Sequence, residues 1–220
     1  MGGELIDTMK KLSELIPTTD TLKSRGAHLL SVKPTQHALE QMDKTLSEFG
    51  YTEYNKDVYH SIRCFGALLI DGTARKGLFL KGECGIGKSF GVEILANVFK
   101  MPVFKPDDFA SVTKEFDGNM ADLEDYVIQG GDFFERPQNI VIDELGSRDT
   151  TKTYGEQFDL MSDILDMRYR AFHKYGVLTI VTTNLSDADI RNRYGRRIED
   201  RMQEMFYIKR VSGVSLRQAV

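Results

Sequence analysis

The chain has 220 residues, enough to bury one good-sized hydrophobic core with a modest appendage but hardly two full domains. Hydrophobic residues make up 41% of it and charged residues 28%, as in ordinary globular proteins. The formal net charge of −4 argues against a protein that coats nucleic acid over its whole surface.

Other features of the sequence exclude several locations and site types. The first residues, MGGELIDTMKKLSELIP, include acids and lack a basic leading region, so we expect no signal peptide. No run of apolar residues approaches the roughly 18 that a membrane span needs. Cys64 and Cys84 form no CxxC pair, which indicates neither a zinc site nor a disulfide framework. These features predict a cytoplasmic protein.

Three helices are predicted before the first strand, each from apolar residues at helical spacing. The residues expected on their buried faces are Leu5, Met9, Leu12 and Ile16 in the first, Leu39, Met42, Leu46 and Phe49 in the second, and Ile62 and Phe65 in the third (Val58–Leu69). Pro17 ends the first helix and Gly50 the second. We expect residues 1–50 to be a helical N-terminal extension that could bind a partner, and residues 51–220 to be the core domain.

Strands and helices alternate in the rest of the chain. The predicted strands cover residues 77–82, 101–105, 139–144, 176–184 and 206–211. The predicted helices cover 89–99, two stretches of the acidic region that follows, about 154–173, and 187–205. Such alternation predicts an α/β fold in which helices flank a parallel, five-stranded sheet.

A phosphate-binding motif, GxxxxGK[ST], lies between the first predicted strand and the helix after it, in the context that the motif requires. Its residues are Gly82, Glu83, Cys84, Gly85, Ile86, Gly87, Lys88 and Ser89. Glycines let backbone N–H groups turn inward around a phosphate, and a helix N-terminus favours anions. We expect Lys88 to bind the β- and γ-phosphates of ATP and Ser89 to bind Mg²⁺. Phe90 is included among the predicted nucleotide contacts.

Two adjacent carboxylates end the strand of residues 139–144. Successive strand residues point in opposite directions, so Asp143 and Glu144 are expected to have different tasks. Asp143 is predicted to hold Mg²⁺, directly or through water, and Glu144 to orient and deprotonate the attacking water. Thr182-Thr183-Asn184 closes the next strand, where Asn184 could bond the γ-phosphate or that water. The predicted activity is Mg²⁺-dependent hydrolysis of ATP.

In this order the motifs resemble the AAA+ ATPases of the DnaC-type helicase loader and IstB-type transposition helper group. The resemblance covers about residues 55–217. The segments that carry it are the GxxxxGKS loop, IVIDELG (140–146), Asp166-Met167-Arg168-Tyr169, TTNL (182–185), YGRRIEDRM (194–202) and the closing GVSLR (213–217).

The resemblance has several implications for this chain. It implies an ATPase core without a C-terminal helical lid, active as a homo-oligomer. It also implies an arginine that acts in trans on ATP bound by the neighbouring subunit, for which Arg201 fits the family pattern best and Arg197 second. Such an arginine meets charge that develops in the transition state. The resemblance leaves open whether Arg217 contacts the nucleotide or a subunit interface.

The resemblance predicts a replicative helicase loader that acts in DNA replication, with a hexameric helicase as partner. Single-stranded DNA is a possible second partner, since residues 191–210 hold seven Lys or Arg against three acids. An IstB-type transposase helper is the nearest alternative, and the balanced charge of residues 1–50 favours the loader. A P-loop small-molecule kinase and a nucleotide-gated adaptor with little hydrolysis are the alternatives from other classes.

Overall fold

The computed structural model describes residues 33–53, 55–131, 135–147, 152–153, 156–157 and 160–216. From Pro34 onward the chain forms one compact unit. The predicted helix over residues 1–16 lies outside the described residues, and so does Arg217. In the part of the chain that is described, no helix is both long and apolar enough to cross a membrane.

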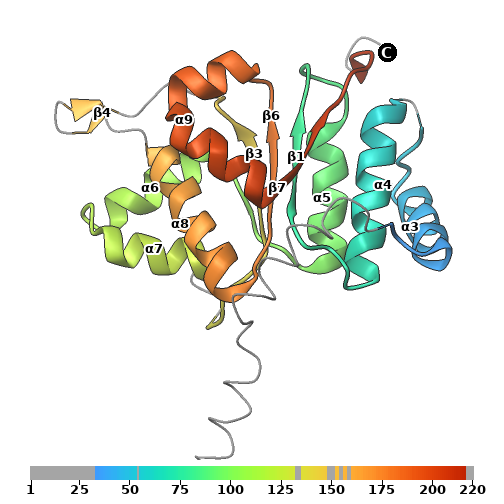
Figure 1. Cartoon of the computed structure of the whole chain (residues 1–220), viewed down its shortest axis with the longest axis horizontal. Coiled ribbons are helices and arrows are strands. Elements are labelled where there is room, and N and C mark those ends of the chain that lie inside the picture. Colours follow the sequence, from blue (N-terminus) through green and yellow to red (C-terminus); the bar gives the residue numbers. More distant parts are fainter. Residues whose placement is uncertain are drawn as a thin grey trace, which may run out of the picture. The chain divides into compact units, whose positions relative to one another are not determined.

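A five-stranded sheet with all neighbours parallel forms the centre of this unit, as predicted (Figure 1). Its strands, in spatial order, are β2 (Val103–Phe104), β3 (Ile140–Leu145), β6 (Thr179–Thr183), β1 (Gly77–Lys81) and β7 (Phe206–Arg210). A separate antiparallel pair consists of β4 (Lys152–Thr153) and β5 (Glu156–Gln157). Because all five main strands run the same way, their carboxyl ends meet at one edge, where α/β folds bind ligands.

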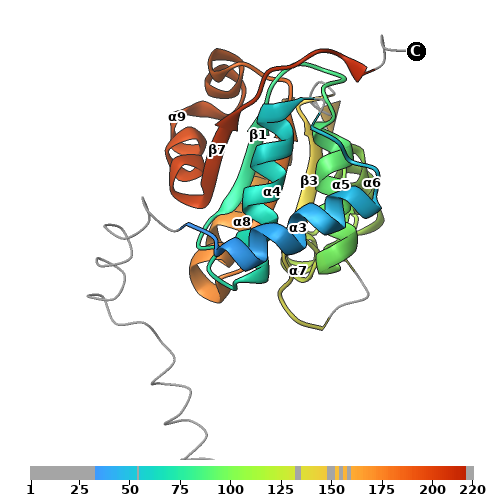
Figure 2. The same cartoon turned by 90° about the vertical axis from the view of Figure 1, so that its right-hand side faces the viewer.

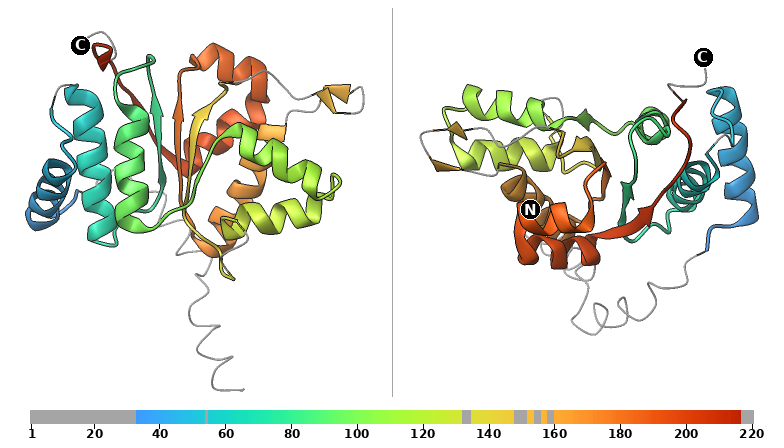
Figure 3. Two further views of the ribbon diagram at one scale, coloured as in Figure 1. Left: turned by 180° about the vertical axis from the view of Figure 1, so that it is seen from behind. Right: turned by 90° about the horizontal axis from the view of Figure 1, so that it is seen from above.

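Helices cover both faces of the sheet (Figures 1 and 2). One face carries α3 (Gln36–Glu48), α4 (Lys56–Ile70) and α5 (Lys88–Phe99). The other carries α6 (Pro106–Glu115), α7 (Met120–Gln129), α8 (Leu160–Tyr175) and α9 (Asp187–Met205). The view from above in Figure 3 separates these two layers.

The period of two in the strands divides the core between these layers. In β1, Leu78 and Leu80 pack with the first layer, whereas Phe79 between them packs with the second. In β3, Val141 joins the first cluster and Ile142 the second. Every residue of β1 is buried, as expected of a strand that is covered on both faces.

The helix α3 confirms most of its predicted pattern and corrects one residue. Met42 and Leu46 are fully buried against α4, as the helical spacing predicts. Phe49, predicted on the same face, is 41% exposed instead. The helix ends at Glu48, so Phe49 is the C-cap and no longer follows the helical periodicity.

The long helix predicted from about Tyr154 begins later than expected. It covers Leu160–Tyr175, so the predicted start is wrong by six residues (160 − 154). The residues before it contribute β4 and β5 instead. Thr153 is β-branched and favours strands, and Gly155 disfavours a helix interior, so local propensity here opposed the helical pattern.

The helix α9 contains a kink at Gly195, whose backbone is non-helical with φ 78° and ψ 165°. A bidentate ion pair spans the kink: Arg191 Nε and Nη2 donate to the two carboxylate oxygens of Glu199, at 2.8 and 2.9 Å. The kink divides α9 into a first part that follows β6 and a second part that leads into β7 (Figure 1). Gly195 permits this bend, because its combination of φ and ψ is essentially restricted to glycine.

Arg168, the arginine of the RY segment, is completely buried and fixes the second helical layer to the sheet. Its Nε donates to Thr179 Oγ1 at 2.9 Å, and its terminal nitrogens donate to backbone carbonyls. Those carbonyls belong to Val127, Ile128, Gln138 and Leu178. One guanidinium thus satisfies oxygens from α7, from the segment before β3 and from the start of β6, which gives this motif residue a structural role.

Candidate active site

The loop of residues 82–87 joins β1 to α5 at the carboxyl edge of the sheet. Gly85 and Gly87 adopt positive φ angles of 82° and 94°, which side chains strongly disfavour. A Cβ on Gly82 would lie 2.1 Å from the carbonyl oxygen of Val211, and one on Gly85 would lie 2.5 Å from Ser215 Oγ. Glycine is therefore required both by the backbone turn and by the close approach of the chain's last segment.

Lys88 begins α5, and its side chain turns back over the loop. Its Nζ donates to the carbonyls of Gly82 (2.7 Å) and Glu83 (2.6 Å) and to Asn184 Oδ1 at the end of β6 (2.8 Å). Burial lowers the pKa of Lys88, because the charged ammonium loses water there. The ammonium is thus held at the loop by weak neutral acceptors, which phosphate oxygens could replace.

Asp143 lies beneath Ser89 and is buried, with 1% of its surface exposed. Its Oδ1 accepts hydrogen bonds from Ser89 Oγ at 2.9 Å and from Thr182 Oγ1 at 2.5 Å. The first contact connects α5 to β3, and the second connects β3 to β6. A hydroxyl and a carboxylate side by side are hard oxygen ligands of the kind that Mg²⁺ prefers.

Glu144 follows Asp143 but turns to a different environment. The register of β3 with β6 shifts between Ile142 and Leu145, and Glu144 has a positive φ of 59°. Its backbone N–H donates to Thr182 Oγ1 at 2.9 Å, while its carboxylate accepts from Lys105 Nζ at 3.3 Å. This bulge separates the two carboxylates, and a positive φ outside glycine often marks a functional site.

Sequence reasoning missed Lys105 as a neighbour of this site. The hydrogen bond to Glu144 raises the pKa of Lys105, because it favours the charged ammonium. Lys105 follows β2 directly and precedes α6. Its place at the end of a predicted strand was the signal that could have revealed it, since all parallel strands end at this edge.

A small pocket of about 240 Å³ opens beside the loop. It is lined by Gly50, Tyr51, Thr52, Asn55, Ile86, Phe90 and Leu216. Tyr51 OH donates to the carbonyl of Gly87 at 3.1 Å, and its ring meets the partly exposed ring of Phe90 edge-on at 5.4 Å. The pocket is thus mostly apolar, with two aromatic rings on its wall.

Asn55 connects three parts of this region. Its Nδ2 donates to the carbonyls of Ile86 (2.9 Å) and Val214 (3.0 Å), and its Oδ1 accepts from the N–H of Val214 (2.9 Å). The N–H of Leu216 also donates to the carbonyl of Gly85, at 2.8 Å. The last described residues are therefore bonded to the loop and to the start of α4, which the sequence did not predict.

The two candidate trans arginines, Arg197 and Arg201, contact α8 rather than the loop. Arg197 Nη2 donates to Asp166 Oδ1 at 3.0 Å, and Arg201 pairs with the same oxygen. Both point to one residue, as their four-residue spacing on a helix predicts. The structure therefore gathers Lys88, Ser89 and Asn184 with the two carboxylates of β3, and places these arginines elsewhere.

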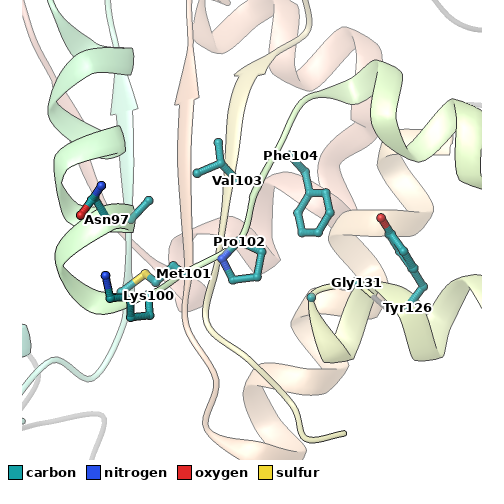
Figure 4. Close-up of a pocket in the computed structure, with 10 residues that line it drawn as sticks. Asn97, Lys100, Met101, Pro102, Val103, Phe104, Tyr126 and Gly131 are labelled. Carbon is teal, nitrogen blue, oxygen red and sulfur yellow. The ribbon is translucent and has the colours of Figure 1, made fainter. Parts of the chain in front are cut away.

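A larger depression of about 600 Å³ lies at the opposite end of the edge strand β2 (Figure 4). Met101 and Pro102, which precede β2, line it together with Lys100, Tyr126 and other residues. Val103 and Phe104 of β2 line it as well, but none of its lining residues follows the end of β2 at the carboxyl edge that carries the candidate site.

No family model and no curated protein matches the sequence. Solved structures do match the fold. The DnaC helicase loader matches with a TM-score of 0.51 and 22% identity, over 71% of this chain and 89% of that one. DnaI matches with a TM-score of 0.55 and 18% identity, over 74% of this chain and 89% of that one.

The replication initiator DnaA, bound to AMPPCP and single-stranded DNA, matches with a TM-score of 0.53 and 14% identity. That match covers 76% of this chain but 49% of the DnaA chain. The predicted α/β fold with its parallel five-stranded sheet is therefore confirmed, and the DnaC helicase loader and DnaI structures share it. The sequence resemblance to the DnaC-type group is confirmed at the level of this fold.

Proposed function

We propose that this protein is an Mg²⁺-dependent ATPase that loads a replicative helicase during DNA replication. One observation carries the proposal: two hydrogen bonds, from Lys88 to Asn184 and from Ser89 to Asp143, gather these four side chains into one cluster at the phosphate-binding loop. Glu144 lies next to that cluster on the same strand end. These are the side chains that binding and hydrolysis of a nucleoside triphosphate require.

The loop and Lys88 bind the phosphates. Lys88 exchanges its bonds to the carbonyls of Gly82 and Glu83 for charge-assisted bonds to phosphate oxygens, which are stronger. Ser89 and Asp143 hold Mg²⁺, whose role is to neutralise charge that develops on the phosphates. Their direct contact, Oγ to Oδ1 at 2.9 Å, supports this assignment, because both oxygens are of the kind that Mg²⁺ prefers.

The adenine base occupies the pocket beside Tyr51 and Phe90. The pocket has a volume of about 240 Å³, which suits a flat aromatic ring system, and the rings of Tyr51 and Phe90 supply apolar and stacking contacts. Asn55 and the segment that ends at Leu216 close the pocket against the loop. The phosphates and the base therefore fit on adjacent parts of one surface.

Glu144 acts as the general base. Its carboxylate is partly exposed next to buried Asp143, so a water molecule could reach it. The contact with Lys105 holds the carboxylate at the strand edge. Asn184, which accepts from Lys88, orients the γ-phosphate or the attacking water.

The active form is a homo-oligomer in which Arg201, with Arg197, completes the neighbour's site. Within one chain these arginines contact Asp166 of α8 and not the phosphate-binding loop. A cation that approaches the γ-phosphate from a second copy supplies about three orders of magnitude or more in rate.

The partner is a hexameric helicase, with single-stranded DNA as a further ligand. The fold is shared with the DnaC helicase loader along most of that chain's length. Residues 1–20, with the predicted stripe of Leu5, Met9, Leu12 and Ile16, provide the helicase-binding segment. Deletion of these residues is expected to abolish helicase binding and to leave ATP binding intact.

A reconstitution tests this function. The purified protein is mixed with the replicative helicase of the same organism and with a single-stranded oligonucleotide, and ATP hydrolysis and helicase–DNA association are both measured. We expect hydrolysis to rise with helicase or oligonucleotide, and helicase to accumulate on DNA only with ATP. Lys88→Ala serves as the matched inactive protein. Hydrolysis that responds only to a small metabolite would assign the site to a kinase instead.

A further inference from the structure

Three arginines meet one carboxylate where α8 and α9 pack together. Asp166 Oδ2 accepts a hydrogen bond from Arg170 Nη1 at 2.5 Å. Asp166 Oδ1 accepts one from Arg197 and forms an ion pair with Arg201. Arg170 also donates to Glu124 of α7, at 3.0 and 2.9 Å. A chain of ion pairs thus runs from α7 through α8 to α9, on the helical layer seen in Figure 1 and from behind in Figure 3.

The two arginines of α9 differ in how tightly they are held. The guanidinium carbon of Arg201 lies 4.6 Å from the centre of the Tyr169 ring, and its side chain is 24% exposed. The Arg197 side chain is 72% exposed. Asp166, at 16%, lies mostly below the surface. Arg201 is therefore confined by a ring on one side and a carboxylate on the other, whereas Arg197 projects outward from the same anchor.

We propose that Asp166 is a positioning residue for ATP hydrolysis: it holds Arg197 and Arg201 in the orientation in which they enter the ATP site of a second copy of this chain. The inference rests on the proposed function, in which these arginines act in trans. Asp166 acts through the arginines. A free arginine side chain samples many rotamers, and the ion pair with Asp166 restricts them before the subunits meet.

The arrangement of α8 and α9 does not depend on this carboxylate for its packing. Leu165 of α8 and Ile198 and Met202 of α9 belong to the same buried apolar cluster. Asn at position 166 keeps the size of the side chain and one carbonyl oxygen but loses the negative charge. The helices therefore stay packed in Asp166→Asn, while the arginines lose their common anion.

Steady-state hydrolysis of Asp166→Asn tests the proposal. We expect kcat to fall by about ten-fold or more, because a small misplacement of a transition-state group is costly, while affinity for a fluorescent ATP analogue stays unchanged. Mixing with Lys88→Ala restores part of the rate, because that protein supplies correctly held arginines to the intact ATP site of the variant. Asp166→Glu, which keeps the charge, recovers part of the loss without mixing.

Two further variants separate positioning from simple damage. Asp200→Asn removes an exposed carboxylate of the same helix, α9, that is not among the contacts of Asp166, and it is expected to keep the wild-type rate. In a protein that already carries Arg197→Ala and Arg201→Ala, Asp166→Asn is expected to slow hydrolysis no further, since it acts through them.

The positioning role is overturned if Asp166→Asn has the wild-type kcat. It is also overturned if Asp166→Asn lowers kcat further in the protein that carries Arg197→Ala and Arg201→Ala. The proposed function fails by a different result. Absence of ATP hydrolysis in the wild-type protein would contradict the proposed ATPase activity. Wild-type rates in the double arginine variant would contradict the proposed action of Arg197 and Arg201 in trans.

Discussion

The ammonium of Lys88 donates a hydrogen bond to Oδ1 of Asn184, 2.8 Å away, so the loop after β1 is joined directly to the end of β6. These residues are 96 positions apart in sequence and come together because β1 and β6 are parallel neighbours. A phosphate that binds between them would be contacted by both, which connects nucleotide binding to the position of Asn184.

Lys88 gives nucleotide affinity a pH dependence. Burial lowers its pKa below the ordinary 10.5 in the free protein, and bound phosphate anions raise it again. Binding therefore takes up a proton above the lowered pKa, and affinity for ATP falls as pH rises through that value. The free energy of unfolding of the ATP-free protein instead rises with pH between the lowered pKa and 10.5. In that range Lys88 is protonated in the unfolded chain but has lost its proton in the folded one.

The measurement is the Kd of a fluorescent ATP analogue over an alkaline pH series at fixed Mg²⁺. We expect the loss of affinity to begin below pH 10.5. Lys88→Arg is the control, since its guanidinium does not titrate in this range. An affinity that stays constant up to 10.5 contradicts the role of the Lys88 charge.

Lys105 is expected to restrain the general base. Its ammonium lies 3.3 Å from the Glu144 carboxylate, so the carboxylate must leave this pairing before it can accept a proton from the attacking water. Both side chains are partly exposed, so the pair contributes at most about 1 kcal/mol. Lys105→Met should raise basal hydrolysis by up to about five-fold without changing ATP affinity. Lys100→Met, at the opposite end of β2 and outside the contact, is the control. An unchanged or lower rate in Lys105→Met argues against the restraint.

Asn55→Ala should loosen the last described residues from the loop. The substitution leaves the carbonyl of Ile86 and both backbone groups of Val214 without their partner. We expect a loss of about 1–3 kcal/mol in the free energy of unfolding and weaker ATP binding. Ser212→Ala, which removes one exposed bond to Asp57, is the matched control. Chemical denaturation that shows equal stability for Asn55→Ala and wild type contradicts this role.

Gly195→Ala should damage the kink of α9. At φ 78° and ψ 165° the backbone is in a region that is essentially restricted to glycine, although a Cβ there would meet no atom within 4 Å. The cost is therefore backbone strain alone, about 1–3 kcal/mol. Thermal unfolding measures it, with Gly72→Ala (φ 63°, open surroundings) as the comparison. If both substitutions lower the free energy of unfolding equally, the kink at Gly195 has no greater need for glycine than the turn at Gly72.

Local motifs predicted the centre of the site, but contacts between distant residues did not follow from the sequence. The spacing of the glycines before Lys88 determines the loop because the constraint lies within eight residues. Asn55 and Val214 are 159 positions apart, and neither belongs to a motif that specifies the other. The predicted start of the long helix at Tyr154 was too early for a related reason. The spacing of apolar residues indicates which face of a helix is buried, but not where strand pairing, as between β4 and β5, takes the place of the helix.

The pair Lys88→Ala and Glu144→Gln tests the central claim most directly, by Mg²⁺-ATP binding and single-turnover hydrolysis in the same preparation. We expect Lys88→Ala to lose ATP binding, because no ammonium opposes the phosphates. Glu144→Gln should bind ATP as the wild type does and hydrolyse it at least about 100-fold more slowly, because the amide cannot accept a proton. Wild-type hydrolysis by Glu144→Gln, or wild-type binding by Lys88→Ala, would contradict the assignment of this site.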